Sequence, residues 1–255
     1  MIDLHSHILP NVDDGSKDMN MSIEMIKEAI KCGTKKIVAT PHYAKGYYTN
    51  EYNKIKEIFP EFKDKIEKEL DVEIYHGQEV YFTENILEEF KMGNIGTIND
   101  SRYMLVEFPP MDFKVESLDY LYELQIRDIV PVVAHPERYR AVMKNPDMLN
   151  EFIEAGCLFQ LNGTSLHGAF GKESQKASRI LLNSGVYNFI GSDAHRSDKR
   201  TMNLTESIEI IKKSNKNYLD LMRESSELLL ENKEVTYQGE KIKVKKGIFS
   251  FIGLK

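Results

Sequence analysis

The sequence contains little cysteine and no long apolar run. Its two cysteines, Cys32 and Cys157, stand in no paired spacing, so neither a disulfide framework nor a cysteine-based zinc site fits. No stretch approaches the roughly 20 apolar residues that span a bilayer, and no charged leader with an apolar segment opens the chain. We therefore expect a cytoplasmic protein without a transmembrane segment.

An excess of positive charge is also missing. The formal net charge is −6, whereas proteins that bind nucleic acid usually carry a clear basic excess that neutralises phosphates. This disfavours a nucleic-acid partner but leaves room for a local basic pocket. With 41% hydrophobic and 29% charged residues, the composition is that of an ordinary globular protein, and 255 residues suffice for one large α/β domain or two small ones. We expect a single domain over residues 1–255.

Seven short apolar runs alternate with mostly helical patterns. The segments between the runs place apolar residues at helical spacing, as from Met21 to Ile30, where Gly33 marks the stop. Pro60 should kink or divide the helix expected over 52–70. Residues 235–244 resemble a hairpin. The strand-like runs are 1–7, 36–42, 72–75, 103–106, 129–134, 157–162 and 186–195.

This alternation implies an α/β fold with parallel strands and right-handed crossovers, and seven or eight strands suggest closure into a barrel. In such a barrel the carboxyl ends of all strands meet at one face, where the following loops build active sites. Polar side chains stand at or just beyond these ends: His5, His7, His42, Glu79, Glu107, His135, Gln160, Asn162, Asp193 and His195.

These polar side chains together predict a metal centre. His5 and His7 share one face of a strand because alternate residues do, and two neutral imidazoles can chelate one ion. Taken singly, Glu79, His42 and Asp193 fit ordinary roles as a solvated loop carboxylate, a capping residue and a helix N-cap. Several carboxylates buried on one rim, however, need cations nearby, and divalent metals supply that charge.

The same residues carry a resemblance to a known family. The sequence resembles the PHP (polymerase and histidinol phosphatase) superfamily, and more closely the bacterial capsule-biosynthesis tyrosine phosphatases of the CpsB/YwqE type. The matching stretches follow the order of the family and span most of the chain: IDLHSHILP (2–10), VDDG (12–15), ATPH (39–42), GQE (77–79), VEFP (106–109), AHPERY (134–139) and GSDAH (191–195).

The resemblance implies a distorted (β/α)7 TIM-like barrel that holds three divalent metal ions, typically manganese. The ligand types alone also suit iron, zinc or cobalt. The family pattern points to Asp14 rather than Asp13 as a ligand. The implied sets are His5, His7, Glu79 and Asp193 for one ion, Glu79, Glu107 and His135 for a second, and Asp14, His42 and His195 for the third.

The implied activity is hydrolysis of phosphotyrosine. The implied partner is the tail of an autophosphorylating tyrosine kinase that regulates capsule or exopolysaccharide synthesis. Neighbouring divalent ions would generate a hydroxide from water at neutral pH and stabilise the attacking and leaving groups. Arg138 and Arg200 are candidates for binding the phosphoryl group, which guanidinium recognises bidentately. Neither cysteine opens a phosphate loop that ends in arginine five residues later, so a cysteine nucleophile is disfavoured.

The sequence does not assign the roles of two loops and is compatible with three other functions. Tyr43, Tyr47 and Tyr48 fit either the mouth of a substrate site or ordinary loop aromatics. The polar loop that starts at Asn162 and contains Ser165 could close the rim, but the sequence assigns it no chemical role. The alternative functions are a small-molecule phosphatase acting on histidinol phosphate, a regulatory partner of polysaccharide assembly without turnover, and a nuclease.

Overall fold

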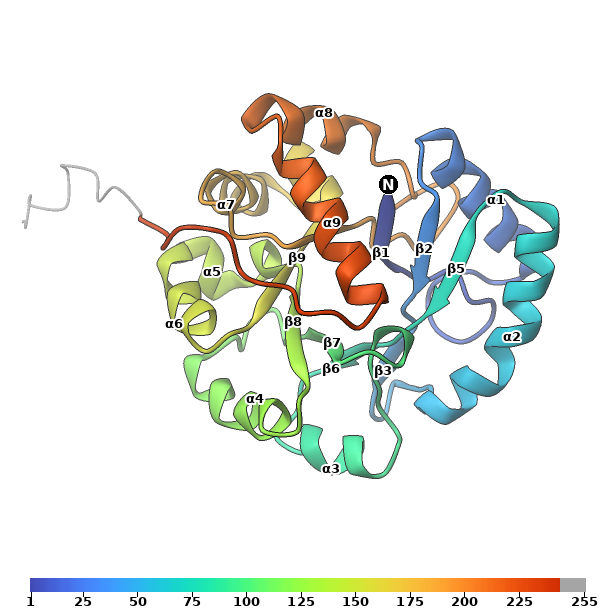
Figure 1. The fold of residues 1–255 in the computed structure, drawn as a ribbon, viewed down its shortest axis with the longest axis horizontal. Helices are drawn as coiled ribbons and strands as arrows, with labels where there is room; N and C mark the ends of the chain where they lie inside the picture. The colour runs from blue at the N-terminus through green and yellow to red at the C-terminus, as the bar shows by residue number, and fades with distance from the viewer. Residues whose placement is uncertain (244–255) are drawn as a thin grey trace, which may run out of the picture.

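The structure is a computed structural model that describes residues 1–243, and it shows a barrel of parallel strands with helices outside (Figure 1). The sequence pattern also predicts a basic, apolar tail with Lys245, Lys246 and Phe249 that packs on the barrel or contacts a partner, and this segment lies outside the described residues. The strands are β1 (Ile2–Ser6), β2 (Lys36–Ala39), β3 (His42–Ala44), β4 (Tyr48–Thr49), β5 (Glu73–His76), β6 (Glu79–Tyr81), β7 (Tyr103–Glu107), β8 (Val130–Ala134), β9 (Leu158–Asn162) and β10 (Phe189–Gly191).

The barrel has the seven strand positions that the sequence predicts, but two of them are split. β2 and β3 occupy one position and β5 and β6 the next, so the hydrogen-bonded order is β1-β2-β5 in one sheet and β10-β9-β8-β7-β6-β3-β4 in the other. The run 36–42 is interrupted because Pro41 has no N–H to donate and restricts the residue before it. The Glu79 N–H donates to the Pro41 carbonyl at 3.0 Å, which restores the pairing on the far side of the break.

β1 closes the barrel against the end of β10 and contains an irregularity. The His7 N–H donates to the Ala194 carbonyl at 2.9 Å, and the Asp193 N–H donates to the His5 carbonyl at 2.8 Å. The register of β1 against β2 shifts between Asp3 and Ser6, as in a β-bulge. Leu4 packs in the apolar interior of the barrel and its neighbour His5 also faces inward, because a bulge changes which side chains share a face.

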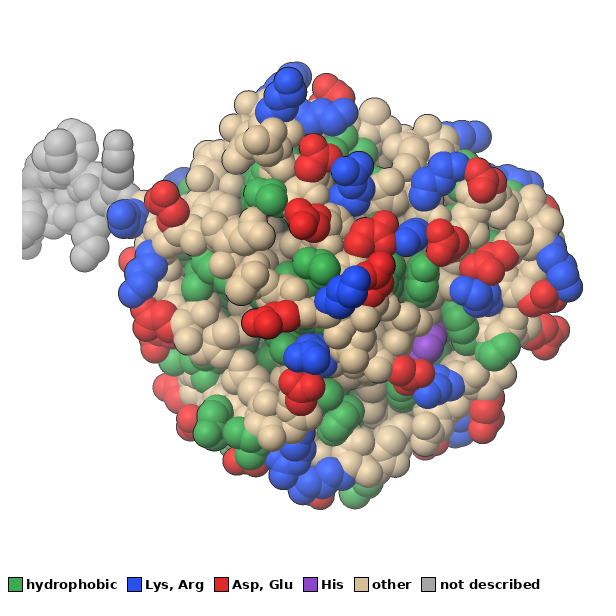
Figure 2. Space-filling model, viewed as in Figure 1, with side chains coloured by type: hydrophobic (Ala, Val, Ile, Leu, Met, Phe, Trp, Pro, Cys, Tyr) green, Lys and Arg blue, Asp and Glu red, His purple; other side chains and the backbone are tan. Residues whose placement is uncertain are grey.

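The helices cover the outside of the barrel, and α9 crosses the barrel end that faces the viewer in Figure 1. On the face drawn in Figure 2, acidic and basic side chains are interspersed, without a broad patch of either sign. In the described part of the chain no helix is long and apolar enough to cross a membrane. The helices are α1 (Met19–Lys31), α2 (Tyr52–Glu69), α3 (Ile86–Lys91), α4 (Leu118–Gln125), α5 (Arg140–Lys144), α6 (Leu149–Glu154), α7 (Lys172–Asn183), α8 (Thr205–Ser214) and α9 (Tyr218–Leu230).

One expectation about local structure is wrong, and of the two effects expected of Pro60, a kink or a division of the helix, the division does not occur. Residues 235–243 form no hairpin but an extended C-terminal strap, because its backbone finds tertiary partners: the Val235 N–H donates to the Tyr103 hydroxyl at 2.8 Å and the Glu240 N–H to the Ser184 carbonyl at 3.0 Å. Pro60 does not divide α2. It lies on the exposed side of the helix, where water can satisfy the carbonyl that lacks its partner, while the opposite face stays packed on the core.

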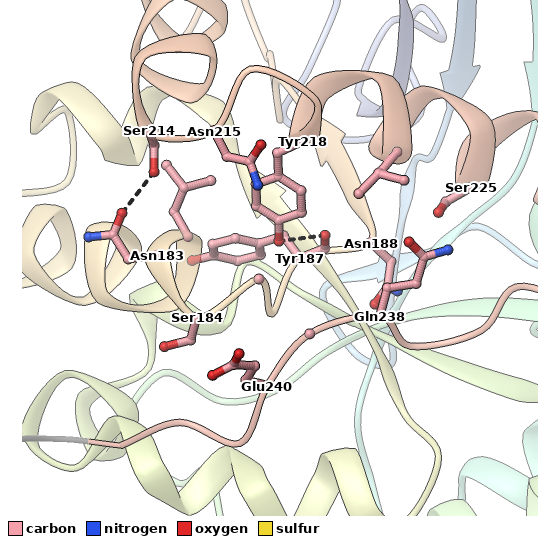
Figure 3. A pocket seen from close by; sticks show the side chains of 14 residues that line it. Asn183, Ser184, Tyr187, Asn188, Ser214, Asn215, Tyr218, Ser225, Gln238 and Glu240 are labelled. Carbon is pink, nitrogen blue, oxygen red and sulfur yellow. Dashed lines mark hydrogen bonds between the residues drawn. The ribbon is translucent and has the colours of Figure 1, made fainter.

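The C-terminal strap also borders a cavity at the end of the barrel where the strands begin (Figure 3). The cavity measures about 280 Å³ and lies between the strap, the α7–β10 connection and the start of α9. Its lining mixes polar side chains with Leu182 and Leu221, and Glu240 is the one charged residue among the described residues that line it. Tyr218 on its wall donates a hydrogen bond to the Tyr187 carbonyl at 2.8 Å. This cavity is separate from the carboxyl ends of the strands, where the predicted site residues lie.

Helix α4 offers a matched test of where the stability comes from. Leu121 is fully buried against β8, whereas Tyr122, the next residue, is 60% exposed. We expect Leu121→Ala to lower the free energy of unfolding by about 2–5 kcal/mol, because it leaves a cavity in the core. Tyr122→Ala should change it by no more than about 0.5 kcal/mol. Urea unfolding of both variants measures the difference, and equal losses would contradict the assigned packing.

Candidate metal centre

The nine predicted ligands come together at the carboxyl ends of the strands, although they are spread over most of the chain. Most lie near the carboxyl end of a strand or on the loop that follows it, whereas His42 and Glu79 open the short strands β3 and β6 that continue the two split positions, so the barrel brings all of them to one face. Glu79 opens β6, for example, and Glu107 ends β7. Three groups have ligand atoms within 4.8 Å of one another: His5, His7, Glu79 and Asp193; His7, Asp14, His42 and His195; and His42, Glu79 and Glu107.

Glu79 lies at the centre of this site and faces four imidazoles. Its Oε2 is 3.1 Å from His5 Nε2, 3.2 Å from His7 Nε2 and 3.0 Å from His42 Nδ1. Its Oε1 is 3.0 Å from His135 Nε2. Among residues 1–243, however, Glu79 Oε2 finds no hydrogen-bond partner of acceptable geometry. Ring nitrogens therefore surround this buried oxygen without donating a hydrogen bond to it. A cation bound by the carboxylate and the imidazoles together would satisfy it.

These groups overlap the implied ligand sets, with two differences: His7 joins the group of Asp14, His42 and His195, and His135 is absent from the group around Glu107. The set of His5, His7, Glu79 and Asp193 appears as implied. Around Glu79 and Glu107, His42 completes the compact group rather than His135, which lies 3.7 Å from Glu107 Oε1 and 3.0 Å from Glu79. His135 therefore stays within reach of both carboxylates.

The loop after β1 separates the roles of Asp13 and Asp14. Asp13 is committed to hydrogen bonds: Oδ2 lies 2.8 Å from His7 Nδ1 and accepts the His42 N–H at 2.9 Å, and Oδ1 accepts the Gly15 N–H at 2.9 Å. Asp14 instead presents Oδ1 to His195 Nε2 at 3.4 Å and to His42 Nε2 at 3.6 Å. This geometry favours Asp14 as the ligand and Asp13 as the residue that orients the His7 ring.

Two further contacts orient imidazoles, and a third holds the backbone of His135. His5 Nδ1 lies 3.1 Å from Gln160 Oε1, which also accepts the His135 N–H at 3.3 Å, and His195 Nδ1 lies 3.0 Å from the Asp193 carbonyl. Partners on Nδ1 fix the tautomer that leaves Nε2 free for a metal. Gln160, which the sequence analysis placed on this rim without a role, thus supports His5.

The backbone is strained where two of these residues leave their strands. His135 and Asp193 have φ of 31° and 51°, in the left-handed region that non-glycine residues rarely adopt. His135 directly follows β8, Asp193 comes two residues after the end of β10, and both turn the chain sharply at the rim. The barrel holds them there through buried contacts, such as the Asp193 N–H donating to the His5 carbonyl.

Burial and the crowding of charged groups shift the pKa values of the side chains at this site. Burial would raise the pKa of Glu79 and Asp193, but His5 and other cationic neighbours outweigh it and lower both pKa values well below the usual range. Burial and the neighbouring Glu79 charge raise the pKa of Glu107 instead. Burial and the Arg138 charge lower the pKa of His135 to about 4, so this imidazole is neutral and able to bind a metal near neutral pH.

Both predicted arginines contact the site through Asp193. Arg138 Nη1 lies 2.5 Å from Asp193 Oδ2, and Arg200 Nη2 lies 2.7 Å from Asp193 Oδ1. Asn162 Nδ2 also donates to Asp193 Oδ2 at 2.8 Å. The two guanidinium groups and six of the nine ligands line an open pocket of about 370 Å³, large enough for the reacting end of a ligand.

Aromatic side chains form part of this pocket, although not all that the sequence suggested. Tyr47 and Tyr48 line it, and the Tyr48 ring stacks on His42 with centroids 5.7 Å apart. Tyr43 does not: it is buried, and its hydroxyl donates to Glu89 Oε2 at 2.7 Å. Tyr81 lines the pocket and was missed, although its place two residues after Glu79 on β6 could have indicated the same face.

The sequence matches the family described as capsular polysaccharide synthesis, CpsB/CapC, over residues 1–234. It is 38% identical to CapC of Staphylococcus aureus over 93% of this chain and 94% of that protein. It is 33% identical to the tyrosine-protein phosphatase YwqE of Bacillus subtilis over 98% of this chain and 100% of that protein.

The fold is also similar to that of a solved structure from this group. A structure described as YwqE from Bacillus subtilis and CpsB from Streptococcus pneumoniae, unique metal-dependent tyrosine phosphatases, superposes with a TM-score of 0.88 at 32% identity. The match covers 96% of this chain and 100% of the other. The distorted (β/α)7 barrel is therefore confirmed, and the chain belongs to the CpsB/CapC family of capsular polysaccharide synthesis proteins.

Proposed function

We propose that this protein is a metal-dependent protein-tyrosine phosphatase. The observation that carries the proposal is the Glu79 cluster, in which one buried carboxylate faces four imidazoles beside two arginines in an open pocket. The relatives named as tyrosine-protein phosphatases, which align over nearly the whole chain, support the same activity. A site of this kind suits hydrolysis of a phosphate monoester.

The residues present fit divalent metal ions. Imidazole and carboxylate donors suit manganese, and also iron, zinc or cobalt. A cation bound by this cluster would satisfy Glu79 Oε2, which has no hydrogen-bond partner within residues 1–243. We propose three ions, held by the sets implied in the sequence analysis, with manganese as the native metal. When bound, such ions lower the pKa of water and bind phosphoryl oxygens, which supplies the nucleophile and stabilises the leaving group.

The side chains of the protein position the substrate. Arg138 and Arg200 each bind one oxygen of the Asp193 carboxylate, a planar two-oxygen group, and guanidinium recognises phosphoryl oxygens in the same way. Tyr47, Tyr48 and Tyr81 border the same pocket and provide apolar surface for a phenyl ring. A phosphotyrosyl side chain would therefore place its phosphoryl group between the arginines and the ligands.

The proposed partner is a phosphotyrosine protein, namely the tail of an autophosphorylating tyrosine kinase that regulates capsule or exopolysaccharide synthesis. Membership in the capsular polysaccharide synthesis family supports this role. The pocket stands open at the rim of the barrel, so a flexible protein tail could reach it without unfolding of the enzyme. The acidic net charge gives no support to a nuclease.

The deciding experiment compares metal content with hydrolysis. The protein is stripped with a chelator, reloaded with Mn²⁺, and assayed on a phosphotyrosyl peptide and on histidinol phosphate. We expect turnover of the peptide to disappear with the metal, to return on reloading, and to exceed that of histidinol phosphate. Faster turnover of histidinol phosphate would favour the small-molecule phosphatase, and a fully loaded protein without turnover would indicate the regulatory partner. Full metal content and undiminished turnover in His135→Ala would overturn the site assignment.

A cysteine nucleophile is tested separately. Cys157 is fully buried, and burial raises the pKa of its thiol to about 12, so almost no thiolate exists at neutral pH. Neither Cys157 nor Cys32 lines the site pocket. We expect the Cys32→Ser/Cys157→Ala double variant to keep kcat within about twofold of the wild type, because no covalent phosphocysteine forms. Steady-state kinetics at saturating Mn²⁺ measure this, and a loss of activity in the folded variant would refute metal-only catalysis.

A further inference from the structure

The connection between β9 and α7 carries an aromatic side chain into contact with both arginines of the site. This is the polar loop to which the sequence assigned no role. In the structure it forms a short 3-10 helix, η5 (Gly163–His167), followed by Phe170. The guanidinium carbon of Arg138 lies 4.4 Å from the centre of the Phe170 ring, and that of Arg200 lies 5.8 Å from it. One ring therefore contacts two cations that come from different parts of the chain.

Apart from their contacts with Asp193, the two arginines receive little restraint from their own elements. Arg138 ends η3 (Pro136–Arg138), a three-residue turn after β8, and the side chain of Arg200 is 36% exposed on the loop after β10. Both are long, flexible side chains that lose much rotamer freedom when they are held in one geometry. A flat aromatic face attracts guanidinium through the ring quadrupole and limits its orientation. Phe170 thus restrains both groups in addition to their contacts with Asp193.

The Phe170 loop is itself tied to the site by Asn162. The Asn162 side chain accepts the Thr164 N–H at 3.2 Å at the start of η5, and the same amide donates to Asp193 Oδ2 at 2.8 Å. Asp193 is the residue that both arginines contact. The start of the loop and the guanidinium groups of both arginines are therefore held by the same carboxylate, that of Asp193.

Glu137 provides a second anchor, and it is the immediate neighbour of Arg138. It is fully buried and accepts three hydrogen bonds: from the Asn162 N–H at 3.1 Å, the Ser165 hydroxyl at 2.8 Å and the Tyr187 hydroxyl at 3.1 Å. Tyr187 is held in turn by Tyr218, whose hydroxyl donates to its carbonyl (Figure 3). Glu137 thus joins the turn that carries Arg138 to the loop that carries Phe170.

We propose that Phe170 is a positioning residue for phosphoryl recognition: its ring holds Arg138 and Arg200 side by side at the site, and Asn162 and Glu137 fix the loop that presents it. The proposal rests on the proposed function in so far as the bound group is a phosphoryl group. It predicts that the ring acts on the affinity for phosphate rather than on metal binding, because Phe170 contacts the arginines and belongs to none of the ligand groups.

The test compares Phe170→Leu with Phe170→Tyr in the manganese-loaded protein. Leucine keeps apolar volume but removes the π face, whereas tyrosine keeps the face and has room for its hydroxyl, since Phe170 borders an open cavity of about 620 Å³. We expect Phe170→Leu to raise both the Kd for inorganic phosphate and the KM for a phosphotyrosyl peptide by about tenfold. The value of kcat should change less than about twofold, because the lost interaction stabilises the bound substrate and the transition state equally. Phe170→Tyr should restore both values, and metal content should stay at the wild-type level.

Each outcome of this test decides the proposal. Tyr122→Leu, which removes an exposed ring on α4, is the matched control and should change neither value. An unchanged phosphate Kd in Phe170→Leu, or equal losses in Phe170→Tyr, would refute the role of the ring. A raised phosphate Kd in a protein that cleaves no phosphotyrosyl peptide would support the role of Phe170 while the phosphatase proposal fails. Should Phe170→Leu unfold below the assay temperature, Phe170→Met, which also lacks the π face, takes its place.

Discussion

Replacing Glu79 with glutamine is expected to lower kcat/KM for a phosphotyrosyl peptide by about 10³-fold, because metal-ion catalysis supplies several kcal/mol of transition-state stabilisation. Glu79 is the carboxylate that the clusters around His5 and around Glu107 share. Glutamine has nearly the same volume, but it carries no charge and replaces one oxygen with an NH₂ group. We therefore expect the variant to fold and to bind fewer metal ions per chain, which elemental analysis of the purified protein measures directly.

Glu88→Gln is the matched control for this substitution. Glu88 lies on α3 with 57% of its side chain exposed, and it pairs with Lys91 at 2.7 Å on the same helix. Its metal content and activity should equal those of the wild type. A Glu79→Gln variant that keeps all its metal and its turnover would show that the cluster does not hold the catalytic ions.

Replacing Arg138 with alanine is expected to lower kcat/KM by about 10²–10³-fold, the loss that follows removal of one preorganised donor to a developing charge. Arg138 reaches Asp193 from η3 and lines the pocket, so its guanidinium lies where a phosphoryl group would approach the ligands. Arg138→Lys should recover only part of this loss, because an ammonium group cannot bind two oxygens in a planar, bidentate manner. Kinetics on a phosphotyrosyl peptide, with metal content measured on the same samples, provide the test.

Arg140→Ala controls for the general loss of a positive charge near the site. Arg140 is only two residues away, but it is exposed on α5 and does not line the pocket. It should keep wild-type kinetics. If Arg138→Ala loses metal as well as activity, Arg138 stabilises the ligand cluster instead of binding the substrate, and the same conclusion follows if Arg140→Ala is equally impaired.

Much of the fold could be predicted because strand and helix periodicities are local properties of the sequence. The seven apolar runs all became barrel positions, and Gly33 follows the end of α1 with a φ of 83° as a helix stop should. The errors came where tertiary contacts outweighed local preference. Pro60 is tolerated because it faces solvent, and the C-terminal strap replaces a hairpin because other elements satisfy its backbone.

The candidate site was predictable to a similar extent, and for a related reason. His and carboxylate residues at the ends of successive strands could be located without coordinates, since all parallel strand ends meet at one face. Tyr81 was missed although it lies two residues after Glu79 on β6, whereas Phe170 could not be recognised in this way. Phe170 stands on a loop whose path depends on Asn162 and Glu137, and aromatic residues on loops carry no sequence signal that separates a site wall from the core. Tyr43 shows the converse, because it is buried beside Glu89 instead of lining the mouth.

The sequence by itself determined the order of the strands, the residue types at their ends and therefore the kind of chemistry that the rim can support. Only the tertiary structure decided which of these residues touch: that four imidazoles face Glu79, that Asp14 rather than Asp13 is free for a metal, and that one ring restrains two arginines. The reason is physical. Periodicity sets the face on which a side chain lies, but barrel closure, the bulge in β1 and left-handed turns at His135 and Asp193 set distances of a few ångströms.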